Sequence, residues 1–202
     1  MIYAAERREK VVEVLKKVGL SEDHYFRFPH ELSGGQVQRL GIASALVIGP
    51  KLIVCDEPVS ALDVSIQAQI LNMLMQLQKE LGLSLLFISH DIGVIRFISD
   101  RIGVMYLGTL VEETDTEELF ANPLHPYTKG LFGLEVWQQE PLAYLGKVSL
   151  LLSGEQPVRT EDFKGCAFST RCPNATEKCR QEAPVFREVK AGHKVACHMV
   201  EE

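Results

Sequence analysis

The sequence predicts an α/β protein built on a parallel sheet, followed by a small cysteine-rich extension. Short apolar runs lie at residues 52–55, 83–88 and 102–107 and show no polar alternation, which is typical of parallel strands buried on both faces. Segments with helical periodicity separate these runs, and such alternation is the pattern of a parallel sheet. Four of the five cysteines lie after residue 165, which sets the last part of the chain apart.

Residues typical of helix caps and helix ends set the limits of the expected helices. The first helix ends at Gly19, the second follows Ser33, and the third spans about 64–81 and closes at Gly82. A short fourth helix is expected at 92–98, between the second and third apolar runs.

The second half of the chain carries weaker local signals. Gly108 and Thr109 predict a tight hairpin, and Thr114 with Glu117 predicts a capping box at the start of a helix. Residues 138–160 mix proline, glycine and apolar residues, and we interpret them as a linker.

Composition and charge exclude several classes of protein. The chain has 202 residues, 46% of them hydrophobic, which suffices for a core and rules out a disordered chain. Asp and Glu outnumber Lys and Arg by 27 to 21, so a basic nucleic-acid-binding surface is not expected. No apolar run approaches the roughly 20 residues of a membrane-spanning helix, and the N-terminal segment lacks the apolar region of a secretory signal. We therefore expect a cytoplasmic protein.

Ionisable side chains follow two of the apolar runs. Asp56 and Glu57 come directly after the first run, and His90 follows the second. Ligands of open parallel sheets bind outside the carboxyl ends of the strands, so these residues should face one site. A carboxylate pair there suits a nucleotide–Mg²⁺ site, in which one acid holds the ion and the other polarises the attacking water. Alternatively, the acids are solvated loop residues and His90 has no ligand.

A glycine pair opens the second expected helix, whose first turn contains Ser33, Gly34, Gly35 and Gln36. Two glycines allow the backbone to approach an anion closely, and the free N–H groups and dipole of a helix N-terminus favour phosphate. The simpler alternative is a serine N-cap followed by a flexible first turn.

Taken together, these pieces resemble the ATP-binding subunits of ABC transporters. The family's signature motif, Walker B segment, D-loop and switch histidine are similar to LSGGQVQR at 32–39, LIVCDEP at 52–58, SALD at 60–63 and SHD at 89–91. Three further segments narrow the resemblance to the dipeptide, oligopeptide and nickel importers: FPHE at 28–31, NPLHPYT at 122–128 and GCAFSTRCP at 165–173.

The resemblance implies a role for each motif residue. Residues 33–36 would contact the γ-phosphate of ATP held mainly by a second ATPase subunit, and Asp63 would communicate across that dimer. Asp56 would organise Mg²⁺, Glu57 would be the general base, and His90 would hold the γ-phosphate and the attacking water. The partners implied are transmembrane permease subunits and, indirectly, an extracytoplasmic peptide-binding protein, at the inner face of the cell membrane.

The resemblance also implies a partial P-loop NTPase fold divided into four segments. We expect part of a helical subdomain with the signature motif, the C-terminal part of the ATPase core, a linker and a cysteine-rich tail, at residues 1–48, 49–121, 122–164 and 165–202.

No G-x-x-x-x-G-K-[ST] phosphate-binding loop occurs in the sequence. The Gly146-Lys147 pair fits the motif at neither end, and the family carries this loop N-terminal to all the motifs above. We therefore expect the C-terminal portion of an ATPase subunit that energises peptide import, and no ATP hydrolysis by the chain alone. The alternative is a non-catalytic metal-binding or regulatory fragment that pairs with intact subunits. The acidic charge balance disfavours a DNA-repair ATPase.

The tail cysteines form a candidate metal site. They are Cys166, Cys172, Cys179 and Cys197, spaced C-x5-C-x6-C-x17-C, unlike the close pairs of zinc ribbons. Four thiolates can hold a [4Fe–4S] cluster, and the resemblance to importer tails favours it. The alternatives are structural Zn²⁺, with His193 or His198 as a replacement ligand, and reduced thiols without metal.

Overall fold

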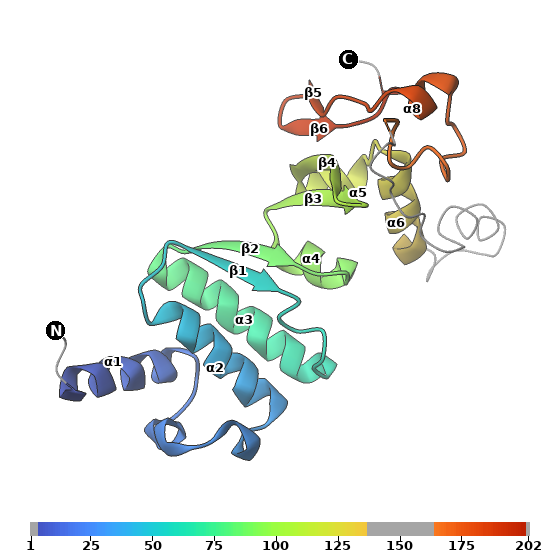
Figure 1. The fold of residues 1–202 in the computed structure, drawn as a ribbon. Coiled ribbons are helices and arrows are strands. Elements are labelled where there is room, and N and C mark those ends of the chain that lie inside the picture. Colours follow the sequence, from blue (N-terminus) through green and yellow to red (C-terminus); the bar gives the residue numbers. More distant parts are fainter. Residues whose placement is uncertain (1–3, 137–163, 201–202) are drawn as a thin grey trace. The chain divides into compact units, whose positions relative to one another are not determined.

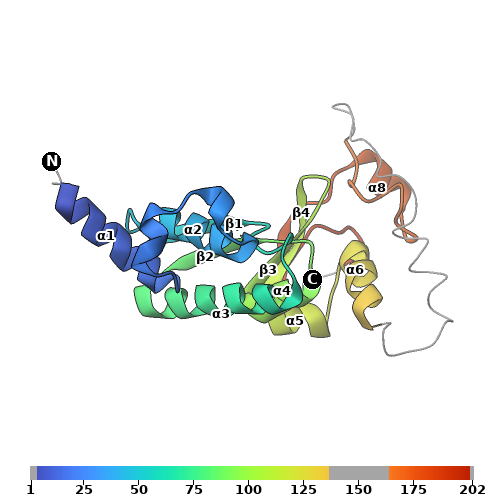
Figure 2. The ribbon, with the colours of Figure 1, turned by 90° about the horizontal axis from the view of Figure 1, so that it is seen from below.

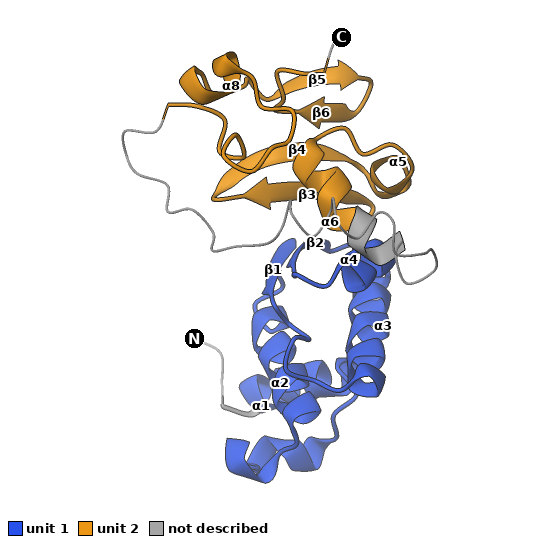
Figure 3. Cartoon of the chain, turned by 90° about the vertical axis from the view of Figure 1, so that its right-hand side faces the viewer, with its two compact units in different colours: residues 1–98 blue, residues 99–202 orange. Residues whose placement is uncertain are grey.

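The structure is a computed structural model that describes residues 4–136 and 164–200. Its packing divides the chain into two compact units, residues 1–98 and 99–202 (Figure 3). The boundary between the units falls inside the expected segment 49–121, and the four segment limits stay predictions. The linker predicted at 138–160 lies outside the described residues.

The first unit contains the helices and the two strands that the sequence predicts for it (Figure 1). Its main elements are α1 (Ala4–Lys17), α2 (Gly34–Leu46), β1 (Leu52–Asp56), α3 (Val64–Leu81), β2 (Ser84–Ile88) and α4 (Ile92–Ile98). Two short 3-10 helices, η1 (Glu22–Phe26) and η2 (Pro29–Glu31), lie between α1 and α2. Gly82 ends α3 with a φ of 63°, a left-handed conformation that glycine adopts without steric cost.

The two strands of this unit pair in parallel. The register runs from Leu52 opposite Ser84 to Asp56 opposite Ile88. One face of the sheet contributes Ile53 and other side chains to a buried core that it shares with α1, α2 and α3. The helices α2 and α3 lie on the same side of the sheet (Figures 1 and 2).

The opposite face of this sheet is apolar and exposed. Leu52, Val54, Leu86 and Ile88 are each between 44% and 58% exposed, while Ile53 and Cys55 between them are buried. Parallel sheets normally have both faces covered, so this apolar face departs from that rule within the described part of the unit. The exposed face is thus a surface on which further polypeptide could pack.

Arg39 of α2 joins the three long helices of the first unit. Its guanidinium donates to the carbonyl oxygen of Val18, the residue directly after α1, at 2.8 Å. It also donates to the Gln69 side chain of α3 at 3.3 Å. A cation near a helix C-terminus satisfies orphan carbonyls and interacts favourably with the helix dipole. Arg39, the third residue after the glutamine of the glycine-rich turn, therefore fixes how α2 packs against α1 and α3.

The second unit is an antiparallel sheet with short helices. Its strands are β3 (Arg101–Tyr106), β4 (Thr109–Asp115), β5 (Arg187–Lys190) and β6 (His193–Val195), in the order β3-β4-β6-β5. The helices are α5 (Thr116–Ala121), α6 (Pro126–Val136) and α8 (Glu177–Gln181). The tail thus adds two strands to the sheet that β3 and β4 begin.

The prediction that residues 102–107 form a third parallel strand is wrong. This run, in β3, pairs antiparallel with β4 instead. Leu107 and Gly108 have φ values of 45° and 73°, which is the geometry of a two-residue hairpin loop. The tight hairpin predicted at Gly108 is confirmed, and it explains the error, because a two-residue loop makes β4 the immediate neighbour of β3.

The capping box predicted from Thr114 and Glu117 is also wrong. Thr114 is a buried residue of β4, and Asp115 is the N-cap of α5. The Thr116 hydroxyl at the start of α5 donates to the Ser99 carbonyl oxygen at 2.5 Å. The helix itself is confirmed, but a tertiary hydrogen bond fixes its start.

An aromatic cluster connects the tail to the rest of the second unit. Phe168 is fully buried, and its ring lies 5.1 Å from that of Tyr106, 5.5 Å from that of Tyr127 and 5.8 Å from that of His125, measured between centroids. Burial of aromatic rings is a major source of packing energy. Residues before Cys172 are therefore packed against β3 and α6.

None of the described helices combines the length and apolar character of a membrane span.

Candidate functional site

The carboxyl ends of β1 and β2 bring the expected acid and histidine together. The Glu57 N–H donates to the Ile88 carbonyl oxygen at 3.0 Å and so extends the parallel pairing by one step. The His90 Nδ1 then lies 2.8 Å from Glu57 Oε1. Asp56, the last residue of β1, is exposed at the same edge. The two strand ends thus form one polar site, as the parallel register dictates.

Glu57 has an unusual backbone conformation. Its φ is 47°, in the left-handed region that non-glycine residues seldom adopt. Such conformations cost about 1–3 kcal/mol and persist where the surrounding structure imposes them, often at functional sites. The second carboxylate oxygen, Oε2, is buried and has no hydrogen-bond partner among the described residues. One oxygen of the Glu57 carboxylate therefore contacts His90, and the other is enclosed by the protein.

The Glu57 carboxylate changes the protonation of His90. Its hydrogen bond and then its negative charge raise the pKa of the exposed His90 imidazole above the ordinary value. Because the pKa is raised in the folded chain, the stabilisation by this ion pair is complete in acid and lost as the pH rises through that pKa. The Glu57 carboxylate therefore favours the protonated form of His90.

The first turn of α2 is a reciprocal cap. Ser33 Oγ accepts from the Gln36 N–H at 3.3 Å, and Gln36 Oε1 accepts from the Ser33 N–H at 3.0 Å. The Gln36 side chain also contacts His24 of η1, with 3.2 Å between the two Nε2 atoms. This contact to His24 had no signal in the sequence, because η1 lacks a periodic pattern. The cap holds the turn in a defined conformation, unlike the flexible turn considered as an alternative.

The starts of α2 and α3 lie side by side. A Cβ on Gly34 would be 3.5 Å from Leu62 Cδ2, and one on Gly35 would be only 2.7 Å from Ile66 Cγ2. Asp63 caps α3, since its Oδ1 accepts from the Ile66 N–H at 3.0 Å. A further hydrogen bond from Ser65, the largest cause, lowers the Asp63 pKa and keeps the cap charged. Two helix N-termini therefore converge where an anion could bind.

The tail brings four cysteines into one neighbourhood. A Cβ on Gly165 would lie 2.7 Å from the Cys179 carbonyl oxygen, and the Cys166 N–H donates to that oxygen at 2.7 Å. Burial raises the pKa of the Cys166 thiol, and the nearby thiols of Cys179, Cys197 and Cys172 raise it further. The four thiols predicted as metal ligands are thus close enough for their charges to interact.

Three of these thiols have polar neighbours. Backbone N–H groups of Phe168 and Asn174 reach Cys166 and Cys172, and the Thr176 hydroxyl lies 3.3 Å from Cys179 Sγ. Among residues 4–136 and 164–200, however, no three histidine, cysteine or acidic side chains form a group that could hold a metal ion.

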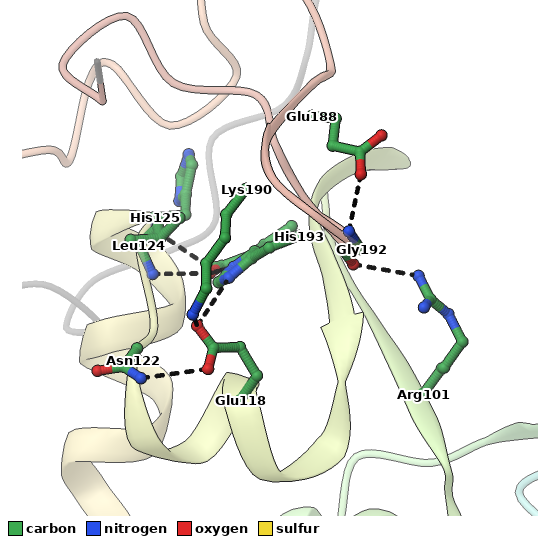
Figure 4. Close-up of polar contacts among 10 residues, drawn as sticks. Arg101, Glu118, Asn122, Leu124, His125, Glu188, Lys190, Gly192 and His193 are labelled. Atoms are coloured by element: carbon green, nitrogen blue, oxygen red, sulfur yellow. Dashed lines mark hydrogen bonds and ion pairs between the residues drawn. The ribbon is translucent and has the colours of Figure 1, made fainter. Parts of the chain in front are cut away.

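The two histidines considered as zinc ligands have other partners. His193 Nε2 lies 2.8 Å from the buried Glu112 Oε1, and His198 Nε2 lies 3.0 Å from the Glu182 carbonyl oxygen. The zinc alternative with a replacement histidine therefore gains no support. No local pattern predicts the contact between Glu112 and His193 (Figure 4), because 81 positions separate the two residues.

Comparison with known proteins first defines the class of this chain. The family described as "ABC transporter" matches residues 2–60, and that described as "Oligopeptide/dipeptide transporter, C-terminal region" matches residues 111–179. A solved ATP-binding cassette in its ADP conformation, MJ1267, has a TM-score of 0.55 and 26% identity, covering 69% of this chain and 52% of that one. The ADP- and phosphate-bound dimer of MJ0796 has a TM-score of 0.51 and 36% identity, covering 57% and 50%. Over the part that is covered, the fold is similar to about half of an ATP-binding cassette.

Curated relatives specify the subfamily. The oligopeptide transport ATP-binding protein AppF of Bacillus subtilis is 52% identical over 98% of this chain and 60% of its own length. The dipeptide transport ATP-binding protein DppF of Haemophilus influenzae is 48% identical over 99% of this chain and 60% of its own. The chain is a homologue of the ATP-binding subunits of oligopeptide and dipeptide ABC transporters, and it spans about 60% of the length of these relatives.

The two signature glycines should respond differently to the same substitution. Gly34→Ala should leave the free energy of unfolding unchanged or raise it by up to about 1 kcal/mol, because the added methyl makes an ordinary contact. Gly35→Ala should lower it by about 1–3 kcal/mol, because the methyl overlaps the stiff Ile66 side chain. Urea unfolding of both variants measures the difference, and Ile66→Ala should shrink the Gly35→Ala penalty. Equal stabilities of the two glycine variants would contradict this packing.

Proposed function

We propose that this chain provides the catalytic and signature elements of an ATPase that energises peptide import by an ABC transporter. The observation that carries the proposal is the Glu57–His90 pair, 2.8 Å apart at the ends of two parallel strands, in the same unit as the capped LSGGQ turn. The similarity to peptide-transport ATP-binding proteins over nearly the whole chain supports it.

Each site residue has a proposed task in ATP hydrolysis. Asp56 would hold Mg²⁺ or its water shell, since carboxylate oxygens are the ligands that this ion prefers. Glu57 would take the proton of the attacking water, and the raised pKa of His90 suits a cationic contact to the γ-phosphate. The unusual φ of Glu57 supports a positioned base.

The glycine-rich turn is proposed to act on ATP bound by a second ATPase subunit. Ser33, Gly34, Gly35 and Gln36 would present the N-terminus of α2 to the γ-phosphate, with Asp63 beside them at the start of α3. The dimeric form of the related cassette MJ0796 supports such a pairing. Permease subunits at the inner face of a membrane, and indirectly a peptide-binding protein, would complete the transporter.

We propose that the 202-residue chain does not hydrolyse ATP alone, because its sequence contains no P-loop to cradle the phosphates. Mixed with an intact ATP-binding subunit of this subfamily, it should stimulate hydrolysis through its signature turn. Ser33→Arg should abolish the stimulation, because a long cation would fill the γ-phosphate position. Ser44→Arg, the same change at an exposed position of α2, should not. The rate of phosphate release, measured for the intact subunit mixed with each variant, distinguishes these outcomes.

Two results would contradict the proposed function. Stimulation by Ser33→Arg equal to that by the unchanged chain would remove the role of the turn. Turnover by the chain alone that Glu57→Gln abolishes would show that no P-loop is needed. Absence of any stimulation by the unchanged chain would favour a non-catalytic regulatory role.

We also propose that Cys166, Cys172, Cys179 and Cys197 bind a [4Fe–4S] cluster. Two thiolates on one zinc ion lie at most about 4.6 Å apart, since each Zn–S bond is about 2.3 Å. In a cluster each thiolate binds a different iron, so wider spacing is tolerated. The shared neighbourhood of the thiols and their N–H donors suit such a set. When bound, the cluster would staple the tail.

Anaerobic purification with iron, sulfide and zinc analysis tests the tail proposal. We expect about four irons per chain and loss of iron in Cys172→Ser, with Cys55→Ser of the first unit as the matched control. Zinc in place of iron, or no metal and an unchanged melting temperature in Cys172→Ser, would contradict the cluster.

A further inference from the structure

The histidine of η1 lies against the glutamine of the glycine-rich turn. The other side chains of η1 are exposed, whereas His24 is half-buried. Its Nε2 lies 3.2 Å from Nε2 of Gln36, which is also half-buried. The position of the imidazole proton decides whether this contact is a hydrogen bond, because one of the two nitrogens must accept.

The cap of α2 gives this contact its direction. Gln36 Oε1 accepts from the Ser33 N–H at 3.0 Å, and a backbone N–H can only donate, so the amide oxygen is the atom that faces Ser33. The amide nitrogen, which can only donate, therefore faces His24. The imidazole must meet it with the lone pair of Nε2.

The contacts of the other ring nitrogen fit this assignment. With the lone pair on Nε2, a neutral imidazole carries its proton on Nδ1, which lies 2.8 Å from Ser21 Oγ and can donate to it. In the opposite tautomer Nδ1 would accept from the Ser21 N–H at 3.2 Å, but two donors would face each other at Gln36. The form protonated on Nδ1 is therefore the one that makes a hydrogen bond at each nitrogen.

Contacts to α1 hold the segment that carries His24. Arg8 of α1 donates to Glu22 Oε1 at 2.9 Å. Its guanidinium carbon also lies 5.6 Å from the ring centroid of Tyr25 and 5.2 Å from that of Phe26. Each such contact is weak at an exposed surface, but together they attach η1 to α1 on both sides of the histidine. The imidazole is thus held independently of Gln36.

We propose that His24 positions the glycine-rich turn by accepting a hydrogen bond from Gln36 through Nε2. The Gln36 amide is then held at both ends, by Ser33 and by His24, which keeps the first turn of α2 in one conformation. N–H donors that are already in place stabilise phosphate charge without reorganisation. His24 is therefore a positioning residue that acts through Gln36. Its effect on ATP hydrolysis rests on the proposed function of the turn.

NMR of the imidazole nitrogens in the full 202-residue chain tests the contact without an ATPase assay. At about pH 8.5, above the ordinary histidine pKa of about 6.5, nitrogen chemical shifts report which ring nitrogen carries the proton. We expect the His24 proton on Nδ1, although free imidazole side chains carry it mainly on Nε2. Gln36→Ala should move the proton to Nε2, because Nδ1 can then accept from the Ser21 N–H. Gln38→Ala, the same change two positions along α2, should not.

Two NMR results would overturn the proposal. One is a His24 proton on Nε2 in the unchanged chain. The other is the same tautomer in the unchanged chain and in Gln36→Ala, since Gln36 would then have no influence on the ring.

Two substitutions of His24 separate positioning of the turn from a role within η1. The amide oxygen of a glutamine reaches about as far as the imidazole Nε2, whereas that of an asparagine reaches only as far as Nδ1. His24→Gln should therefore keep an acceptor for Gln36, and His24→Asn should keep only the contact to Ser21. Hydrogen exchange of the Gln36 N–H should be about three- to tenfold faster in His24→Asn, the scale of one neutral hydrogen bond, and nearly unchanged in His24→Gln. Equal exchange in the two variants would contradict the positioning role.

The effect on ATP hydrolysis is measured by mixing the same variants with an intact ATP-binding subunit. His24→Asn should lower the maximal stimulation of phosphate release about three- to tenfold, and His24→Gln should keep most of it. Equal stimulation by the two variants would contradict an effect of His24 on the turn. If the unchanged chain gives no stimulation, the proposed function fails, and the tautomer and exchange results still decide whether His24 holds Gln36.

Discussion

The parallel pairing of β1 and β2 is the constraint on which the candidate ATPase site depends. The register sets Asp56 opposite Ile88, and the Glu57 N–H continues it to the Ile88 carbonyl oxygen. That hydrogen bond accompanies the left-handed φ of Glu57 and places its carboxylate on His90. A shift of one residue would send every side chain of a strand to the other face, so the pairing determines the chemistry.

Local sequence signals are sufficient to predict the helices and strands of the first unit. Apolar runs without polar alternation predict both parallel strands. Ser33 is the N-cap of α2, and Asp63 and Gly82 are the N-cap and C-cap of α3. The proximity of Glu57 and His90 followed from strand polarity alone. The sequence could not show that Gly35 is required by Ile66, because that contact depends on how two helices pack.

Long-range pairing explains what the sequence did not predict in the second unit. The apolar run in β3 resembles a parallel strand, but the two-residue loop at Leu107 and Gly108 commits it to an antiparallel neighbour. The cysteine pattern predicts a separate tail extension, but β6 of the tail pairs with β4 in one sheet. Neither periodicity nor composition carries such contacts, because they join residues far apart in the chain.

The central claim is that Glu57 and His90 act as a pair, and an NMR titration of the His90 imidazole tests it most directly. We predict a pKa above the ordinary histidine value of about 6.5 in the unchanged chain. Glu57→Gln should bring it back towards that value, and Asp91→Asn, which removes the weakest of the raising influences, should change it less. An identical His90 pKa in the unchanged chain and in Glu57→Gln would contradict the account.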